Sequence, residues 1–370
     1  MRRPLRAVVV GTSFGGRVHV PALQAAGFEV VAVVGRDPDR TRTRANDLGV
    51  AHAFTSIDEA LSLPDIDAVT VSTPPDAHTA PILTAIAQGK HVLCEKPFAL
   101  NAADGQAMYD AAVAAGVVHM CAFEFRWRPE ESVAKRAIDG GFVGSVEFAT
   151  CVQITALVAG GVHKAFNEEW WFDRDRGGGI LNASGSHYID RFRMWFGEVE
   201  AVSARLQIVG DHSADDAEDT YTMTLRMSSG ATALIQQCSA SWGESFRTIR
   251  AVGDRGSVWL GRDSAFLATS DGTRELEVPD DLLVPPEPPR RLDDPKHAFT
   301  FMELPPFIRL AERFRDAIHA DDPHFTPHVG APPSPTFRDA LMVQRAIDAA
   351  RESSERDGEW VELEQLPHNE

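Results

Sequence analysis

Glycines near the N-terminus follow a short apolar run at a spacing that suits phosphate binding. Residues 5–10 read Leu-Arg-Ala-Val-Val-Val, and residues 11–16 read Gly-Thr-Ser-Phe-Gly-Gly. Gly11 permits a tight turn at the end of a strand, and Gly16 lets the following helix pack closely against that strand. Backbone amides at the start of such a helix favour an anion such as a pyrophosphate. The turn therefore predicts a dinucleotide site, although Ser13 replaces the middle glycine of the Gly-x-Gly-x-x-Gly pattern.

A purely structural strand–helix turn is the alternative interpretation of this glycine-rich segment. Its place after the first strand of a βαβ unit favours cofactor binding instead, because a dinucleotide site belongs there. The cofactor contacts that we predict in this turn are Gly11, Ser13, Phe14 and Gly15.

The residue that would meet the adenosine ribose should lie about 20 residues further on, at the end of the second strand. Gly35 and Arg36 fill that place, and Asp37 follows them. A guanidinium pairs well with a phosphate, so Arg36 favours NADP over NAD, with NAD as the alternative. In that alternative Arg36 is a solvated loop charge and Asp37 binds the ribose.

Short apolar runs alternate with helical patterns in the first third of the chain. The runs are rich in Val, and amphipathic stretches such as residues 81–88 and 102–115 follow them. This rhythm is typical of βαβ units with a parallel sheet that is covered on both faces. We therefore predict an N-terminal Rossmann domain over residues 1–125. Its predicted strands are residues 5–10, 30–34, 68–72, 91–94 and 117–123.

The pattern changes after Pro129. A helix is predicted over residues 131–139, and alternating runs separated by turn residues then favour antiparallel hairpins. These predicted strands are residues 143–161, 201–209, 219–227, 231–239 and 257–260. A Pro-rich surface excursion over 279–306 precedes two helices, predicted at 306–320 and 336–352. The pattern predicts an α+β domain over residues 126–370 with a large, mostly antiparallel open sheet, whose C-terminal helices could pack back on the first domain.

Length, charge and cysteine content narrow the class of protein. A chain of 370 residues exceeds one hydrophobic core, which predicts two domains. The formal net charge of −18 repels phosphate backbones, so a nucleic-acid partner is not expected. The cysteines lie far apart and form no metal or disulfide motif, which suits a reducing compartment. Neither a membrane span nor a signal peptide is recognisable, so we expect a cytoplasmic protein with no metal and no membrane partner.

Three further motifs follow the glycine-rich turn in a fixed order. Residues 72–78 read Ser-Thr-Pro-Pro-Asp-Ala-His, residues 95–97 read Glu-Lys-Pro, and residues 177–190 read Gly-Gly-Gly-Ile-Leu-Asn-Ala-Ser-Gly-Ser-His-Tyr-Ile-Asp. Together they resemble the Gfo/Idh/MocA family, the relatives of glucose–fructose oxidoreductase and inositol dehydrogenase. The resemblance covers nearly the whole chain, down to residues 337–344.

The resemblance implies a Rossmann domain followed by an open α/β domain whose sheet often forms the oligomer interface. We accordingly expect a homodimer or homotetramer that assembles through the second-domain sheet. The family also implies hydride transfer between nicotinamide and a hydroxyl-bearing carbon, commonly on a sugar or cyclitol. By the motif match, Lys96 sits beside the nicotinamide and the reacting oxygen. The other cofactor contacts implied by the match are Thr73, Pro74, His78 and Glu95.

Oxidation of a secondary alcohol needs a proton acceptor and a cation near the developing alkoxide. Lys96 can polarise that oxygen and shuttle the proton, and Pro97 biases the Lys96 backbone to an extended conformation. A Lys-Pro pair in an unrelated loop would indicate a surface turn. The family match favours a catalytic role for Lys96 instead.

His187 is the second catalytic candidate, because imidazole titrates near working pH. It lies on a predicted helix over 185–195, with Asp190 one turn further on the same face. Asp190 could orient the ring or bind substrate. The alternative is a helix-capping or hydrogen-bonded core histidine.

Ala183 departs from the family pattern, since many members carry Asp four residues before this histidine. On a helix the neighbouring Asn182 and Ser184 point about 100° away, so they cannot simply replace it. The chemistry would then depend on Lys96 and His187 alone.

Aromatic and charged stretches at residues 124–129 and 167–173 flank the expected cleft. Aromatic faces suit both sugar rings and nicotinamide, so Arg126 and Trp171 are candidate substrate contacts. The alternative for both stretches is core or interdomain packing.

The sequence as a whole predicts an NAD(P)-dependent dehydrogenase or reductase that acts on a CH–OH group of a sugar, cyclitol or related polyol. One alternative is a cofactor-binding regulator that does not turn over. A less favoured alternative is an NAD-dependent glycosidase, because such relatives are typically exported and this chain shows no signal sequence.

Overall fold

A computed structural model describes residues 3–159, 169–213, 216–289, 297 and 299–366. Its internal contacts divide the chain into two compact units. Unit 1 comprises Met1–Arg128 and Val284–Leu341, and unit 2 comprises Pro129–Leu283 and Met342–Glu370. The predicted boundary at 125/126 puts residues 126–370 in the second domain and lets its C-terminal helices pack back on the first. This division places residues 284–341, which include one of those helices, in unit 1.

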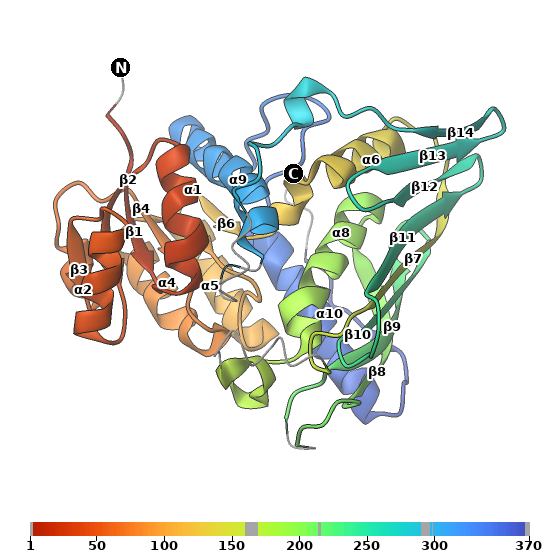
Figure 1. Cartoon of the computed structure of the whole chain (residues 1–370), viewed down its shortest axis with the longest axis horizontal. Helices are drawn as coiled ribbons and strands as arrows, with labels where there is room; N and C mark the ends of the chain where they lie inside the picture. The colour runs from red at the N-terminus through yellow and green to blue at the C-terminus, as the bar shows by residue number, and fades with distance from the viewer. Residues whose placement is uncertain (1–2, 160–168, 214–215, 290–296, 298, 367–370) are drawn as a thin grey trace. The chain divides into compact units, whose positions relative to one another are not determined.

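Unit 1 contains a six-stranded parallel sheet in the order β3-β2-β1-β4-β5-β6 (Figure 1). The strands are β1 (Arg6–Val10), β2 (Glu29–Val34), β3 (His52–Phe54), β4 (Ala68–Val71), β5 (His91–Cys94) and β6 (His119–Cys121). Strands β1 and β4 are neighbours although β2 and β3 lie between them in sequence, so the strand order reverses there. This arrangement confirms the predicted Rossmann fold. Strand β3 escaped prediction because it is three residues long, none of them buried, and has no apolar run.

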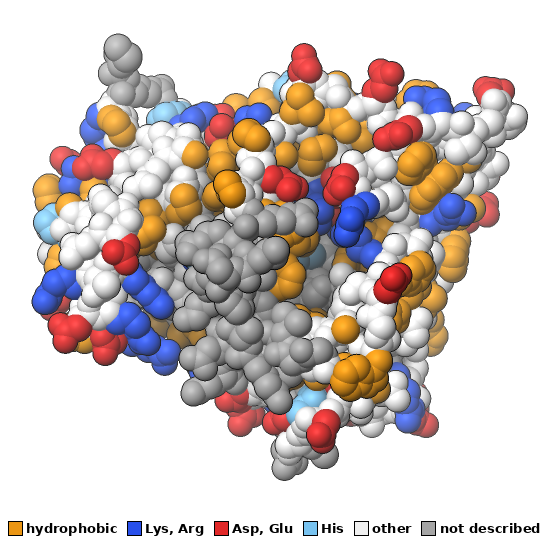
Figure 2. All heavy atoms as spheres, in the orientation of Figure 1, with side chains coloured by type: hydrophobic (Ala, Val, Ile, Leu, Met, Phe, Trp, Pro, Cys, Tyr) orange, Lys and Arg blue, Asp and Glu red, His pale blue; other side chains and the backbone are white. Residues whose placement is uncertain are grey.

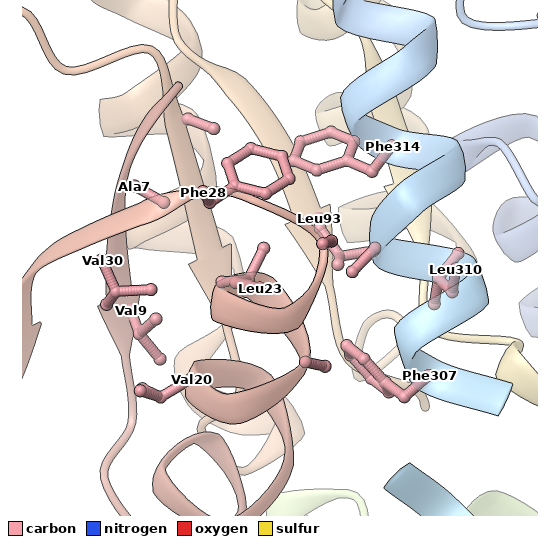
Figure 3. Packing of buried hydrophobic residues seen from close by; sticks show 14 of the residues in the cluster. Ala7, Val9, Val20, Leu23, Phe28, Val30, Leu93, Phe307, Leu310 and Phe314 are labelled. Atoms are coloured by element: carbon pink, nitrogen blue, oxygen red, sulfur yellow. The ribbon is translucent and has the colours of Figure 1, made fainter. Parts of the chain in front are cut away.

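Helices surround this sheet, and one of them comes from late in the chain. The helical elements before residue 128 are η1 (Gly15–His19), α1 (Val20–Ala25), α2 (Pro38–Asp47), α3 (Ile57–Leu61), η2 (Pro75–Ala77), α4 (Thr79–Ala87), α5 (Ala102–Ala115) and η3 (Glu124–Trp127). Helix α9 (Thr300–Ala320) packs against α1 and η3. Figure 3 shows Phe307 and Phe314 of α9 on the side of the helix that faces Leu23 and Phe28, and Leu310 belongs to the same buried cluster.

Helix α9 begins six residues earlier than the predicted start at 306, so Pro305 and Pro306 lie inside it. A proline inside a helix removes a backbone donor, which is why the sequence favoured a start at the second proline. Both prolines are buried in the structure, and burial of apolar surface offsets the lost hydrogen bonds.

Unit 2 contains a nine-stranded sheet in the order β14-β13-β12-β11-β7-β10-β9-β8-β15, in which only the β7–β10 pair is parallel. This sheet confirms the predicted, mostly antiparallel second fold. Its strands are β7 (Val146–Ile154), β8 (Val199–Gln207), β9 (Thr220–Met227), β10 (Thr232–Cys238), β11 (Phe246–Gly253), β12 (Gly256–Leu260), β13 (Ala265–Thr269), β14 (Gly272–Glu275) and β15 (Val361–Glu362). The predicted strand over 143–161 ends earlier, at Ile154, and its residues 160–161 lie outside the described part of the chain.

Helices of unit 2 lie on one face of this sheet. The remaining helical elements among the described residues are α6 (Pro129–Asp139), η4 (Glu169–Phe172), η5 (Arg174–Arg176), η6 (Leu181–Gly185), α8 (Ser186–Phe196), η7 (Asp280–Leu282) and α10 (Phe337–Glu355). Helix α6 packs against β12 and β13, and Figure 1 shows α6 and α8 on the same side of the strands. On β7 and β11 the inward residues Ala149, Cys151, Ile249 and Ala251 are fully buried. The opposite face, which we call the outer face, carries Phe148 and Val252, both exposed.

Among the residues that the structure describes, no helix combines the length and apolar character needed to cross a bilayer. Within the same residues, no group of His, Cys, Asp and Glu side chains is arranged to hold a metal ion.

Candidate cofactor and active site

The glycine-rich turn lies where strand order reverses in the Rossmann sheet, at the carboxyl ends of β1 and β4. Ligands of open α/β sheets bind at such a point. Gly11 has φ +103°, and a Cβ built on it would lie 2.6 Å from the carbonyl oxygen of Ser72. A Cβ on Gly15 would lie 2.4 Å from the Ser72 hydroxyl. Both positions therefore need glycine, and the turn provides the close backbone surface that a dinucleotide requires.

Arginine side chains gather beside this turn. Arg44 of α2 donates a hydrogen bond to Thr12 Oγ1 at 2.7 Å. Burial lowers the pKa of Arg44, and repulsion from Arg40 and Arg17 lowers it further, so the three guanidiniums lie within electrostatic reach of one another. Figure 2 shows Lys and Arg side chains on the part of the surface that α2 occupies in Figure 1. We call Arg17, Arg40 and Arg44 the basic cluster.

Arg36 and Asp37, at the end of β2, are both exposed. The Asp37 carboxylate accepts a hydrogen bond from the Arg40 amide at 2.8 Å and so caps the N-terminus of α2. Arg40 and Arg44 were missed in the sequence, although their spacing of one helical turn could have shown that they share a face.

The loop after β4 is tied to the loop after β5 by His78. This ring is fully buried, with Nε2 at 2.7 Å from Thr73 O and Nδ1 at 3.1 Å from Phe98 O. Burial lowers the pKa of His78. Thr73 and Pro74 stay partly exposed. Of these predicted cofactor contacts, Thr73 and Pro74 can reach a ligand directly, whereas His78 holds the two loops together.

The Glu95-Lys96-Pro97 motif follows the end of β5, and the Lys96–Pro97 peptide is cis. Glu95 is buried, and its Oε1 lies 3.1 Å from His19 Nε2. Its other oxygen, Oε2, accepts a hydrogen bond from the Lys96 amide at 3.1 Å. The Lys96 side chain is partly exposed. The motif thus combines a backbone held by Glu95 with a partly exposed lysine.

Glu124 follows β6 and is buried next to this motif. Burial and the negative charge of Glu95 raise the pKa of Glu124, while Lys96 lowers it. The sequence did not single out His19, and it placed Glu124 in a stretch that flanks the expected cleft without giving it a role. The position of Glu124 just after a parallel strand was the available signal, because carboxyl ends of such strands meet at one sheet edge. That edge carries the residues that follow β1, β4, β5 and β6.

The candidates of unit 2 begin with His187 at the start of α8, where it is buried. Asp190 on the same helix is also buried, and it lies 4.0 Å from Arg193. Trp171 in η4 is partly buried. The beginning of its stretch, residues 167 and 168, lies outside the described residues. Because Lys96 belongs to unit 1, its pairing with His187 stays a prediction.

Arg126 lies inside unit 1 and is buried. Its guanidinium pairs with Asp339 at 3.3 Å and donates to Pro333 O at 3.2 Å. These contacts fasten η3 to residues 333–339, and a substrate contact by Arg126 stays a prediction.

Ala183 lies in η6, one turn before His187. The side chain of Asn182 donates to Gly177 O at 2.8 Å, and the hydroxyl of Ser184 accepts from Gln237 Nε2 at 2.9 Å. Both neighbours of Ala183 are therefore engaged within unit 2.

Comparison with known proteins finds a family match in each of the two units. The family described as an oxidoreductase family with an NAD-binding Rossmann fold matches residues 5–123, and the GFO/IDH/MocA C-terminal domain matches residues 132–259. D-apiose dehydrogenase of Paraburkholderia graminis is 26% identical over 98% of this chain and 90% of its own. D-xylose 1-dehydrogenase (NADP(+)) 2 of Haloferax volcanii is 27% identical over 96% of this chain and 99% of its own.

A solved structure of levoglucosan dehydrogenase in complex with NADH and L-sorbose has the same fold. Its TM-score is 0.82 at 24% identity, and the match covers 99% of this chain and 100% of the other. The two family matches, in the order and at the places that the motifs predict, confirm the resemblance. This chain belongs to the Gfo/Idh/MocA family of oxidoreductases.

Proposed function

We propose that the protein is a nicotinamide-dependent dehydrogenase or reductase that acts on a hydroxyl-bearing carbon of a sugar or related polyol. The observation that carries the proposal is the edge of the Rossmann sheet, where the Gly11 turn, the Thr73–Pro74 loop and Lys96 follow neighbouring parallel strands. The named relatives that act on apiose and xylose support the substrate class.

In the proposed chemistry Lys96 acts on the substrate and Glu95 positions Lys96. Bound nicotinamide supplies the hydride acceptor or donor. The Lys96 side chain donates a hydrogen bond to the reacting oxygen, stabilises negative charge there and exchanges a proton with it. Glu95 holds the Lys96 peptide through its amide. We retain His187 as the second candidate for proton transfer and Asp190, Arg126 and Trp171 as candidate substrate contacts.

We also propose that the cofactor is NADP. Arg36 is exposed at the end of β2, and the basic cluster lies beside the turn. Asp37 already caps α2, which leaves its carboxylate less suited to a ribose hydroxyl. An anion near the cluster would relieve the repulsion among its guanidiniums. A 2′-phosphate supplies such an anion.

A panel of pentoses, hexoses, anhydrosugars and cyclitols, each mixed with the protein and NADP⁺ or NAD⁺, tests the function. We expect absorbance of reduced nicotinamide to rise with at least one aldose or anhydrosugar. Cyclitols are expected to react more slowly than the best sugar, because Ala183 replaces the acidic residue of many relatives. Reduction of the cofactor by none of these compounds would contradict the proposal.

We further propose that copies of the chain assemble through the outer face of the nine-stranded sheet. Phe148, Phe246 and Val252 are exposed there, and Trp259 and Phe266 stack at 5.4 Å. Figure 2 shows hydrophobic side chains over the region of strands β7 and β11–β13. An apolar face of this kind typically marks an interface. Its position on unit 2 agrees with the expected homodimer or homotetramer.

Substitution of Val252 by Glu is expected to convert the oligomer to monomer, because a charge would be buried at the interface. Sedimentation velocity at micromolar concentration measures this change. The matched control is Val329→Glu, since Val329 is an exposed valine of unit 1. A monomeric unmodified chain, or an oligomer that tolerates Val252→Glu, would refute assembly through this face.

A further inference from the structure

His19 is a buried polar residue that the proposed chemistry does not use. It closes η1, the helical turn that starts at Gly15, and its side chain has no exposed surface. The ring packs against Phe307 of α9, with centroids 4.5 Å apart, and meets Phe14 edge-on at 5.8 Å. Burial of a polar ring among aromatic side chains is costly unless the ring is hydrogen-bonded. The buried His19 ring is therefore expected to have a hydrogen-bond partner.

That contact is the carboxylate of Glu95. Nε2 of His19 lies 3.1 Å from Glu95 Oε1, and among the described residues Nδ1 of the same ring has no hydrogen-bond partner. The second oxygen of Glu95 accepts from the Lys96 amide. One carboxylate thus joins the helical turn that follows the glycine-rich loop to the peptide of Lys96.

We propose that His19 is a positioning residue for Lys96 and acts on it through Glu95. This inference rests on the proposed function, in which Lys96 contacts the reacting oxygen. The His19 ring N–H fixes one oxygen of Glu95, so the carboxylate cannot rotate away from the Lys96 amide. Without His19 the carboxylate regains that rotation, and the direction of the Lys96 backbone is no longer held. Misplacement of a catalytic group by about 1 Å can cost 10²-fold in rate.

The residues around His19 and Lys96 favour Glu95 as the carboxylate that links the two. Glu124 is the other buried carboxyl near Lys96, and burial together with the charge of Glu95 raises its pKa. The raised pKa makes Glu124 less readily ionised, and a protonated carboxyl accepts hydrogen bonds more weakly than a carboxylate. The aromatic rings of Phe14 and Phe307 exclude water from His19, which strengthens its hydrogen bond to Glu95.

Hydrogen exchange of the free protein tests the linkage without any ligand. The variant His19→Phe keeps a ring between Phe14 and Phe307 but removes the hydrogen bond. We expect the Lys96 amide to exchange at least about tenfold faster in this variant. The amide of Ser72, which donates to Val10 O at 2.8 Å at the same sheet edge, serves as the internal control and should not change. Equal acceleration at Ser72, or none at Lys96, would overturn the proposal.

A second pair of variants keeps the test decisive if His19→Phe is unstable. The amide of Gln in His19→Gln can reach Glu95, whereas the shorter side chain of His19→Asn cannot. We expect His19→Gln to keep the slow exchange of Lys96 and His19→Asn to lose it. Equal behaviour of these two variants would show that the ring matters for packing alone.

Turnover then links position to chemistry. With the best sugar of the panel, we expect His19→Phe to lower kcat by about 10- to 100-fold with less than threefold change in the KM for cofactor. Adding Glu95→Gln should lower kcat by less than twofold further, because both changes break one linkage. A wild-type kcat, or a loss confined to cofactor KM, would overturn the proposal.

Failure of this inference is distinguishable from failure of the proposed function. If Lys96→Met turns over normally, the role of Lys96 itself is wrong. If Lys96→Met is inactive while His19→Phe keeps wild-type kcat, only the positioning role of His19 is wrong. If no sugar reacts with the unmodified chain, the exchange rates still judge the linkage among His19, Glu95 and Lys96.

Discussion

Substitution of Lys96 by Met should lower kcat by at least about 10³-fold, because it removes both a proton-transfer group and a cation beside the reacting oxygen. Met preserves most of the length of the side chain, and the Lys96 amide keeps its bond to Glu95. The cofactor Kd should therefore change by less than about threefold. Steady-state absorbance of reduced nicotinamide gives kcat, and quenching of tryptophan fluorescence gives the Kd.

Lys90→Met is the matched control for this variant. Lys90 precedes β5, whereas Lys96 follows it, so the two lysines flank the same strand at opposite ends. The Lys90 ammonium donates to Ile66 O at 2.9 Å and takes no part in the proposed site. We expect Lys90→Met to keep kcat within about twofold of the unmodified chain. A Lys96→Met variant that retains more than a tenth of kcat would remove Lys96 from the mechanism.

Substitution of Arg36 by Ala should raise the Kd for NADPH by about 10- to 100-fold, the expected cost of one charge-assisted hydrogen bond to phosphate. The Kd for NADH should change by less than about threefold, because NADH has no 2′-phosphate. Calorimetric titration of each variant with both cofactors measures the ratio. The effect should shrink at high salt, since Arg36 is exposed.

Arg42→Ala is the control for the loss of one arginine. Arg42 lies on α2 and pairs with Asp39 at 3.8 Å, and its side chain is 69% exposed. It is two residues from both Arg40 and Arg44, which places it on another side of the helix. We expect both cofactor affinities to be unchanged in this variant. An equal loss of NADPH and NADH affinity in Arg36→Ala would contradict the assignment of the 2′-phosphate to Arg36.

The sequence predicted those elements that a run of neighbouring residues identifies, such as a strand made of consecutive apolar residues. Strands β1, β2, β4 and β5 consist largely of buried apolar residues, and this pattern follows from burial on both faces of a parallel sheet. Strand β3 has no such run. The predicted C-terminal helices were free to pack back on the first domain, but no local signal marked residues 284–341 as part of unit 1. Helix α9 has an apolar face, but its sequence does not reveal that this face packs against α1 and η3.

The residues of the candidate site also fall into those that a local motif identifies and those that only the fold brings to the site. Gly11, Thr73, Pro74, Glu95 and Lys96 were predicted because they lie in motifs that directly follow predicted strands. His19 and Glu124 belong to no such motif. His19 contacts Glu95, which lies 76 residues later in the chain. Glu124 is buried close enough to Glu95 and Lys96 for their charges to shift its pKa. Arg126 was singled out from an aromatic and charged stretch and Asp190 for its place one turn after His187, yet each has a charged partner within its own unit. Residue type alone does not reveal which charge is already paired.

Equilibrium titration of the unmodified chain with NADPH and NADH measures whether the protein binds a nicotinamide dinucleotide. We predict one binding site per chain for the reduced cofactor, with NADPH bound more tightly. It also predicts loss of this site in Gly11→Val, since the Cβ would lie 2.6 Å from the Ser72 carbonyl oxygen. Gly89→Val is the control, because Gly89 also has a positive φ but nothing lies within 4 Å of its Cβ position. Failure of the unmodified, folded chain to bind either cofactor would contradict the account.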